Sequence, residues 1–272
     1  MLTTSKGFAI IGMGYWGQII YKNLKDLVQH DITTYDEFKP SASSVDSLDD
    51  IDADHIFVCV TASEHYRICE HFLKKEKTKV FCEKPLTNDI AKSRCLFQMA
   101  KDNNNYLFVD WLFTYNNEVM YIKDHFFDKK ILGEVLNINM NRLNKGPERF
   151  DTNAMHDLAS HDVSILNYWF GQKATHTHWV SYKRNRKSIQ DDSCVGILNF
   201  YGATAQVNCS WEHNIKDRHC ILGFEKGIVC WDDIAKTIVI NDKEDVTLIQ
   251  SSPIKNAISA FYNGSLSQEI VR

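Results

Sequence analysis

Long apolar runs, proline, glycine and charge of one sign are all scarce in this chain of 272 residues, and each absence excludes a class of protein. No apolar run approaches the roughly 20 residues of a membrane-spanning helix. A content of 12 Gly and 4 Pro, beside 44% hydrophobic residues, excludes collagen-like and disordered chains. Lys and Arg number 31 against 35 Asp and Glu, so the net charge of -4 provides no broad basic surface. The composition therefore predicts a globular protein that partners neither a membrane nor a nucleic acid.

The printed sequence also shows no pattern typical of a leader peptide, a disulfide framework or a zinc site. The start, MLTTSKGFAIIGMG, lacks the apolar stretch and the small-residue cleavage site of a signal peptide. The eight cysteines are dispersed, none in a Cys-x-x-Cys pair, and most stand inside apolar runs. His176 and His178 have no accompanying ligand motif, and their alternation fits one face of a strand. We therefore expect a cytoplasmic protein with reduced cysteines and no metal site.

Short β-branched apolar runs alternate with amphipathic stretches through residues 1–115, which is typical of βαβ units around a parallel sheet. The polar stretch FKPSASSVDSLDDIDAD predicts a loop with at most a short helix. Thr87 or Asn88 is available as the N-cap of the third helix. We predict strands at 8–11, 32–35, 56–60, 80–82 and 107–109, and helices at 15–29, 64–75 and 89–101.

The pattern changes after about Trp111, and residues 116–272 predict a second, α+β domain built on a largely antiparallel open sheet. Helices are expected at 118–128 and 157–170, and the amphipathic segment 252–264 is expected to pack back as a helix. Strands are expected at 135–142, 175–182, 193–200, 203–211, 219–224, 228–231 and 237–240. The fold class is thus α/β, with an α+β second domain.

Three glycines complete a Gly-x-Gly-x-x-Gly motif where the first strand passes into the first helix. Gly12 permits the tight turn, Gly14 leaves room for a pyrophosphate, and Gly17 lets the helix and the strand pack closely. The helix N-terminus supplies unpaired N–H groups to the phosphates. The alternative is a glycine turn that serves packing alone. The preceding strand, the following helix and an acid at the expected spacing favour a Rossmann dinucleotide site instead.

That acid is Asp36, which ends the second strand near the spacing of the carboxylate that binds an adenosine ribose 2′-hydroxyl. A carboxylate there repels a 2′-phosphate and favours NAD, whereas Lys39 nearby keeps NADP as the less favoured cofactor. The residues expected to contact the cofactor are Gly12, Gly14, Tyr15, Trp16, Gly17, Asp36, Thr61, Glu83 and Lys84.

A second motif, VFCEKPL, places Lys84 directly after the fourth strand, at the sheet edge where open α/β folds bind ligands. Pro85 keeps the preceding residue extended, so the ammonium group can project into a cleft. A lysine there can hold a substrate hydroxyl and favour the alkoxide that precedes hydride departure. The alternative is an ordinary solvated surface lysine.

A third motif, MHDLASHDVSILNYWFG, puts Asp157, His161, Ser164 and Tyr168 on one polar stripe of a helix. Asp157 lies one turn before His161, where a carboxylate can orient the imidazole or help to bind substrate. Histidine is the side chain best suited to exchange a proton near neutral pH. The alternative is a simple contact between two side chains on a helix surface.

Together, Gly-x-Gly-x-x-Gly at 12–17, Glu-Lys-Pro at 83–85 and Asp-x-x-x-His-Asp at 157–162 resemble the glucose-fructose oxidoreductase / inositol dehydrogenase / MocA (Gfo/Idh/MocA) family, in order and approximate spacing. ILGEV at 131–135 extends the resemblance over nearly the whole chain. The resemblance implies that Lys84 and His161 flank the reacting carbon, and that Asp157 binds substrate or orients the histidine.

Two further stretches, NRLNKGPERFDTNAMHDLASHD and SWEHNIKDRHCILGFEKGIVCWDD, resemble a branch associated with nucleotide-sugar or aminosugar biosynthesis. This resemblance makes Arg142, Asn144, Asn153, Lys216 and Arg218 candidates for contact with an anionic or polyhydroxylated substrate. The alternatives are ion pairs at strand ends for the charged residues and an N-cap for Asn153.

The leading functional hypothesis is an NAD-dependent oxidoreductase that moves hydride between nicotinamide and a sugar hydroxyl or keto carbon, on a nucleotide sugar. One alternative is a glycoside hydrolase that uses transient oxidation by bound NAD, and another is a non-catalytic dinucleotide or sugar sensor. Release of free sugar without net NADH would distinguish the first alternative, and dinucleotide binding without catalysis would distinguish the second. The family resemblance also implies a homo-oligomer, a dimer or a tetramer.

Overall fold

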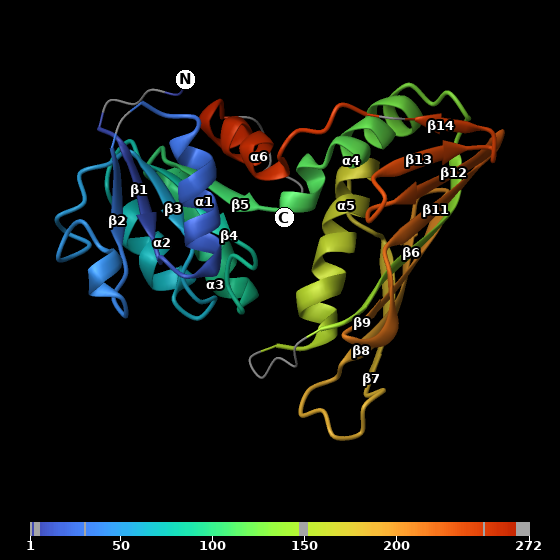
Figure 1. Ribbon diagram of the computed structural model, residues 1–272, viewed down its shortest axis with the longest axis horizontal. Helices are drawn as coiled ribbons and strands as arrows, with labels where there is room; N and C mark the ends of the chain where they lie inside the picture. Colours follow the sequence, from blue (N-terminus) through green and yellow to red (C-terminus); the bar gives the residue numbers. More distant parts are fainter. Residues whose placement is uncertain (1, 3–5, 30, 147–151, 247, 265–272) are drawn as a thin grey trace. The chain divides into compact units, whose positions relative to one another are not determined.

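The computed structural model describes residues 2, 6–29, 31–146, 152–246 and 248–264, and the chain divides into two compact units (Figure 1). The first unit contains residues up to Leu112 together with the described part of the chain from Ser252 onward. The second unit runs from Phe113 to Ser251. Over the described ranges, no helix combines the length and the hydropathy that crossing a bilayer requires.

The first unit is built on a five-stranded parallel sheet with the order β2-β1-β3-β4-β5. Its inner strands β1 and β3 are fully buried and largely apolar, as expected for a parallel sheet covered on both faces. The strands are β1 (Phe8–Ile11), β2 (Ile32–Tyr35), β3 (His55–Val58), β4 (Lys79–Glu83) and β5 (Tyr106–Asp110). The helices are α1 (Tyr15–Lys25), α2 (His65–Leu73), α3 (Ile90–Asp102) and a 3-10 turn at Pro40–Ala42.

The two faces of this sheet have different cores. Aliphatic side chains of the strands pack against Ile68 and Phe72 of α2 and Leu96 of α3. On the other face, a row of phenylalanines from β3, β4 and β5 meets Phe261 of α6 (Pro253–Tyr262), with ring centroids 5.3–5.7 Å apart. The last helix therefore belongs to the first unit, whereas the sequence-based division assigned it to the second domain. The physical reason is the aromatic face, which this helix covers.

One helix cap also differs from the sequence-based expectation. The N-cap of α3 is Asp89, not Thr87 or Asn88. Its carboxylate accepts hydrogen bonds from the backbone N–H groups of Ala91 at 2.7 Å and Lys92 at 3.3 Å. A carboxylate both accepts these bonds and complements the helix dipole.

The second unit holds a nine-stranded mixed sheet with the order β14-β13-β12-β11-β6-β9-β8-β7, and β10 pairs with β6 beside this path. Only the β6–β9 pair is parallel among the described pairs of this sheet. The strands are β6 (Val135–Lys145), β7 (His176–Tyr182), β8 (Ser193–Phe200), β9 (Ala203–Ser210), β10 (Glu212–Asp217), β11 (His219–Phe224), β12 (Gly227–Asp232), β13 (Thr237–Ile240) and β14 (Glu244–Val246). The strands β10 and β14 have no counterpart in the sequence-based prediction.

Helices α4 (Asn117–Ile122) and α5 (Ser160–Phe170) cover one face of this sheet and share its core (Figure 1). A 3-10 turn at Leu112–Tyr115 precedes α4. A π-helical turn at Lys123–Asp128 continues α4, and another at Met155–Ala159 leads into α5. The predicted helices at 118–128 and 157–170 are therefore present, but each contains a wider turn that periodicity alone does not reveal.

Candidate functional site

The turn between β1 and α1 has the geometry of a dinucleotide-binding loop. Gly12 has φ +92°, and a Cβ there would lie 2.8 Å from the backbone of Cys59 and Val60. A Cβ on Gly17 would lie 1.8 Å from the carbonyl oxygen of Gly12, so only glycine lets the helix and the strand approach this closely. A Cβ on Gly14 would meet no atom within 4 Å, which leaves open space beside the helix N-terminus. The loop thus fits the phosphates of a dinucleotide.

The carboxylate of Asp36 is held against this loop. Its Oδ2 accepts a hydrogen bond of 2.7 Å from the backbone N–H of Met13. Its Oδ1 accepts bonds of 2.9 Å from the N–H groups of Phe38 and Lys39. The acid is therefore fixed at the carboxyl end of β2, where the predicted ribose contact lies. The side chain of Lys39 is exposed.

Tyr15 and Trp16 begin α1 and remain 77% and 42% exposed, with their rings in an edge contact at 5.7 Å. Thr61 is also exposed, in the turn that follows β3, and its carbonyl accepts the N–H of Glu64. The three side chains lie near the carboxyl ends of β1 and β3, on the side where a parallel sheet binds its ligand. Each remains available for cofactor contact.

The Glu-Lys-Pro motif begins at the last residue of β4, and the Lys84–Pro85 peptide is cis. Its first residue, Glu83, pairs in register with Asp110 at the end of β5, and both carboxyl groups are buried. Burial raises the pKa of Glu83 to about 7, although the neighbouring Lys84 acts to lower it. Burial and the adjacent Glu83 carboxyl raise the pKa of Asp110 well above its usual range. The pair therefore retains a proton near neutral pH, since two buried carboxylates in contact cannot both ionise cheaply.

We expect Glu83→Gln to stabilise the protein more at pH 8 than at pH 5. The pKa of Glu83 in the folded protein lies above its value in the unfolded chain. Its favourable contribution to the free energy of unfolding is therefore fully present below about pH 4.5 and is lost as the pH rises through about 7. Glutamine resembles the protonated acid and does not carry this cost, which is about 3 kcal/mol at its fullest. Thermal unfolding across pH 5–8 measures the effect as a difference of several degrees in Tm.

The control for this experiment is Glu37→Gln, which removes a carboxylate whose side chain is about half exposed. Its effect on Tm should change little with pH over the same range, because solvent screens the charge. Equal behaviour of the two variants would contradict the buried-proton assignment.

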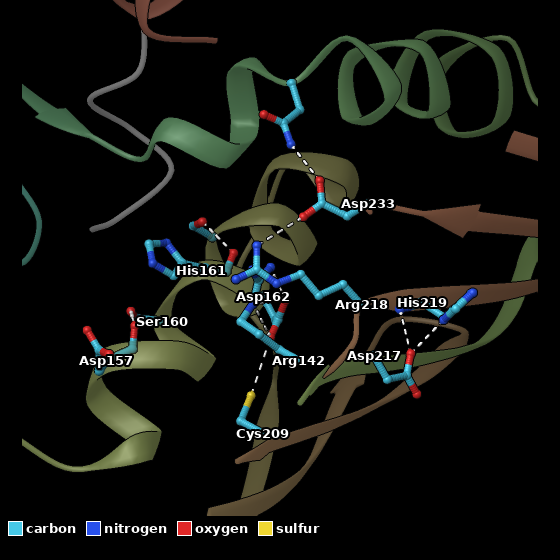
Figure 2. Close-up of polar contacts among 12 residues, drawn as sticks. Arg142, Asp157, Ser160, His161, Asp162, Cys209, Asp217, Arg218, His219 and Asp233 are labelled. Atoms are coloured by element: carbon cyan, nitrogen blue, oxygen red, sulfur yellow. Dashed lines mark hydrogen bonds and ion pairs between the residues drawn. The ribbon is translucent and has the colours of Figure 1, made fainter. Parts of the chain in front are cut away.

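His161 and Asp157 lie on the second unit, where Figure 2 shows them on the same helical segment. The ring of His161 meets the ring of Phe113 edge-on, with centroids 4.7 Å apart. The Oδ2 of Asp157 accepts a hydrogen bond of 3.3 Å from the indole N–H of Trp211. Aromatic side chains therefore fix both members of the predicted acid–base pair. Asp157 falls within the π-helical turn and His161 just beyond it, so their spacing is not that of a regular α-helix.

Arg142 does not have the environment of a substrate-binding residue. Its side chain is 4% exposed, and its Nε and Nη2 donate to the Asp162 carboxylate at 2.7–3.1 Å (Figure 2). The Cys209 thiol also donates to Asp162, at 3.4 Å, and the guanidinium lies 4.3 Å from the ring centroid of Phe113. The prediction of direct substrate contact by Arg142 is therefore corrected to the alternative, a structural ion pair. Phe113 contacts both the guanidinium of Arg142 and the imidazole of His161. The Arg142–Asp162 ion pair therefore also supports the imidazole through this ring.

Asn153 acts as a helix cap, which was the alternative to substrate binding. Its Oδ1 accepts a hydrogen bond of 2.9 Å from the backbone N–H of His156. Arg218 is partly exposed, and its Nη1 lies 3.5 Å from Asp233, whose other oxygen accepts from the amide of Asn116 at 3.2 Å (Figure 2). Arg218 thus combines a strand-end ion pair with remaining access to solvent.

The two remaining candidates are open to solvent to different degrees. Lys216 lies on β10 and is exposed, and Asn144 lies half-buried on β6, the strand that pairs with β10. Both therefore remain candidates for substrate contact. For a metal, the described ranges contain no group of three or more His, Cys, Asp or Glu side chains that could hold an ion.

Three contacting residues were not predicted as part of the site. Asp110 ends β5 in the same way that Glu83 ends β4. Both apolar runs, VFCE and LFVD, stop at an acidic residue, and this common feature could have revealed the pair. Phe113 and Trp211 carry no such local signal, because each reaches the helix from a distant part of the chain.

Comparison with known proteins accords with this geometry. Residues 6–111 match the profile of the oxidoreductase family with an NAD-binding Rossmann fold, and residues 124–230 match the Gfo/Idh/MocA C-terminal domain. The chain belongs to the Gfo/Idh/MocA oxidoreductase family. This membership makes the first unit an NAD(P)-binding Rossmann domain. Among curated proteins, no sequence matches the chain.

Solved structures share the fold at low identity. UDP-N-acetylglucosamine 3-dehydrogenase from Acidithiobacillus ferrooxidans is 18% identical, with a TM-score of 0.85 over 95% of this chain and 88% of that one. A putative myo-inositol dehydrogenase from Sinorhizobium meliloti 1021 is 18% identical, with a TM-score of 0.79 over 96% and 89%. An oxidoreductase from Agrobacterium radiobacter in complex with NAD+, L-tartaric acid and magnesium is 16% identical, with a TM-score of 0.77 over 96% and 88%. These similarities establish the fold.

Proposed function

We propose that this oxidoreductase is an NAD-dependent dehydrogenase that transfers hydride between C4 of nicotinamide and a carbinol or keto carbon of a nucleotide-linked sugar. The observation that carries the proposal is Lys84, placed at the carboxyl end of β4 directly after a buried carboxyl pair and on the ligand-binding edge of the sheet. The glycine loop fits the dinucleotide, which supplies the hydride acceptor or donor when it is bound.

Each proposed catalytic residue has one task. In the oxidative direction, the imidazole of His161 takes the proton of the substrate hydroxyl, and in reduction it returns that proton. The ammonium of Lys84 stabilises the developing charge on the same oxygen. Asp157, itself held by Trp211, helps to orient the imidazole or the substrate. The protein thus supplies placement and charge stabilisation.

A nucleotide sugar as substrate class is supported by two observations. The Acidithiobacillus structure of the same fold is named as a UDP-sugar dehydrogenase. Lys216 and Arg218 provide cationic groups on and beside β10, and such groups pair with phosphates. A steady-state assay of the purified protein with NAD and a panel of UDP- and dTDP-sugars tests the proposal. Absence of turnover in both directions on the whole panel would contradict it.

We expect Asp36→Ala to reduce the preference for NAD over NADP by about tenfold or more. The carboxylate is fixed beside the glycine loop by Met13 N–H, so a 2′-phosphate meets its charge directly. Removal of that charge leaves Lys39 as the nearby cation. The ratio of kcat/KM for the two cofactors measures the change.

Asp46→Ala is the control, because Asp46 lies in the loop that follows β2 and serves no proposed cofactor contact. Its cofactor ratio should equal that of the wild type. An unchanged ratio in Asp36→Ala would show that the carboxylate does not select the cofactor.

We also propose that the protein is a homo-oligomer that associates through the sheet face left uncovered by α4 and α5. Four large apolar side chains on this face are 38–52% exposed, namely Val180, Tyr182, Ile221 and Ile228. These side chains lie on β7, β11 and β12, and apolar side chains left exposed on an open sheet face favour association with a second copy. Light scattering coupled to gel filtration should give a mass of at least two chains, and a mass of one chain would contradict the proposal.

A further inference from the structure

His65, the first residue of α2, connects two loops at the carboxyl edge of the Rossmann sheet. Its side chain is buried, with 1% of the residue exposed. Its Nδ1 lies 2.7 Å from the carbonyl oxygen of Pro85, and its Nε2 lies 3.1 Å from the carbonyl oxygen of Val60. One imidazole ring therefore spans the loop after β3 and the loop after β4.

The connected carbonyl groups belong to neighbours of proposed site residues. Val60 directly precedes Thr61, which is a predicted cofactor contact. Pro85 directly follows Lys84, the proposed catalytic lysine. A shift of the Pro85 carbonyl moves the backbone from which the Lys84 side chain extends.

The protonation state of the ring decides which contact is a hydrogen bond. Burial lowers the pKa of His65, whereas the carbonyl groups of Pro85 and Val60 act in the opposite direction. A neutral imidazole has one N–H and donates to one carbonyl group at a time. The shorter distance, to Pro85, assigns the proton to Nδ1.

We infer that His65 is a positioning residue, whose Nδ1–H bond to the Pro85 carbonyl holds the Lys84 backbone in place for hydride transfer. The inference rests on the proposed function, because it gives Lys84 a catalytic task. The side chain of His65 acts through the loop and is not itself a catalytic group.

The alternative is a histidine with a structural role away from the proposed site, and the same unit contains such a residue. His55 is buried at the opposite end of β3, with 6% of the residue exposed. Its Nδ1 lies 2.8 Å from Asp54, and its ring packs against Phe8, Phe261 and Tyr262. His55→Leu is therefore a matched control, because it replaces a buried histidine of the same unit at the amino edge of the sheet.

Three substitutions of His65 separate its two contacts. In asparagine the amide nitrogen is two bonds from Cβ, as Nδ1 is in histidine, so His65→Asn preserves a donor toward Pro85. In glutamine the amide nitrogen is three bonds from Cβ, as Nε2 is, so His65→Gln offers a donor toward Val60 and none toward Pro85. His65→Leu removes the donor and retains an apolar side chain.

Hydrogen exchange read by mass spectrometry tests the position of the loop without any assay of activity. We expect peptides covering residues 83–90 to exchange faster in His65→Leu and His65→Gln than in the wild type. His65→Asn and His55→Leu should leave this segment at the wild-type rate. Unchanged exchange in both His65→Leu and His65→Gln, or an increase spread evenly over the unit, would overturn the inference. If His65→Leu does not fold, the comparison of His65→Gln with His65→Asn decides.

Kinetics then test the consequence for catalysis. We expect His65→Gln to lose about 10- to 100-fold in kcat, since a displacement of about 1 Å can have such an effect, while KM for NAD changes less than about threefold. His65→Asn should restore most of kcat. If Lys84→Ala lowers kcat but His65→Gln does not, the positioning role is wrong and the proposed function stands. If Lys84→Ala retains full turnover, the proposed function fails, and the exchange data still report whether His65 holds the loop.

Discussion

Replacement of Lys84 or of His161 by alanine is expected to lower kcat by about 10²- to 10⁴-fold, the range typical for loss of a positioned acid, base or charge-stabilising group. The dissociation constant for NAD should change by less than about threefold, because most of the expected dinucleotide contacts come from the glycine loop and Asp36. Steady-state kinetics with the sugar substrate, together with titration of NAD by fluorescence, measure the two quantities separately.

Matched controls exist for both substitutions. His156 lies on the same helical segment as His161 but is exposed, and Lys92 is an exposed lysine of α3. His156→Ala and Lys92→Ala should each retain wild-type kcat. If Lys84→Ala and His161→Ala weaken NAD binding and leave kcat intact, both residues serve binding, and the proposed chemistry is wrong.

Replacement of Arg142 by methionine is expected to destabilise the protein by about 3–5 kcal/mol, because it leaves the Asp162 carboxylate buried without its cation. Asp162→Leu should cost a similar amount, since it leaves the guanidinium buried. The double variant Arg142→Met/Asp162→Leu should recover much of the loss, because no uncompensated charge remains. Urea unfolding of the four proteins forms a double-mutant cycle that measures the coupling.

An exposed ion pair provides the control for this cycle. Lys6 and Asp52 lie 3.1 Å apart, with side chains 60% and 81% exposed. Lys6→Met should change the free energy of unfolding by less than about 1 kcal/mol, because solvent screens the interaction. If the single substitutions at Arg142 and Asp162 cost equally little, the buried pair does not have the structural role assigned to it.

The local motifs of the site were predictable from sequence. The glycine positions follow from backbone sterics, and the structure has a positive φ at Gly12 and near contact between Gly17 and Gly12. The end of a parallel strand can be read from where an apolar run stops, and this placed Asp36 and Lys84 at the ligand-binding edge. Such features depend on residues close together in the chain.

Contacts between distant segments could not be predicted in this way. Arg142 carried a substrate-binding prediction from the family resemblance. An arginine on a strand has the same appearance in sequence whether it faces a ligand or Asp162, 20 residues away. The segment containing Phe261 was predicted as a helix, but its periodicity does not state which apolar surface it covers. The π-helical turn at Met155–Ala159 escaped prediction because its side-chain pattern matches that of an α-helix.

The sequence by itself determined the glycine loop with its acid and the succession of a parallel sheet and a largely antiparallel sheet, because these depend on short-range backbone geometry and on the alternation of apolar residues. The family followed from the resemblance of three motifs. Only the tertiary structure shows that Arg142 pairs with Asp162, that Glu83 is buried beside Asp110, and that His65 lies between the loop after β3 and the loop that carries Lys84. The reason is desolvation, since the charge and hydrogen bonding of a polar side chain depend on which distant groups exclude water from it.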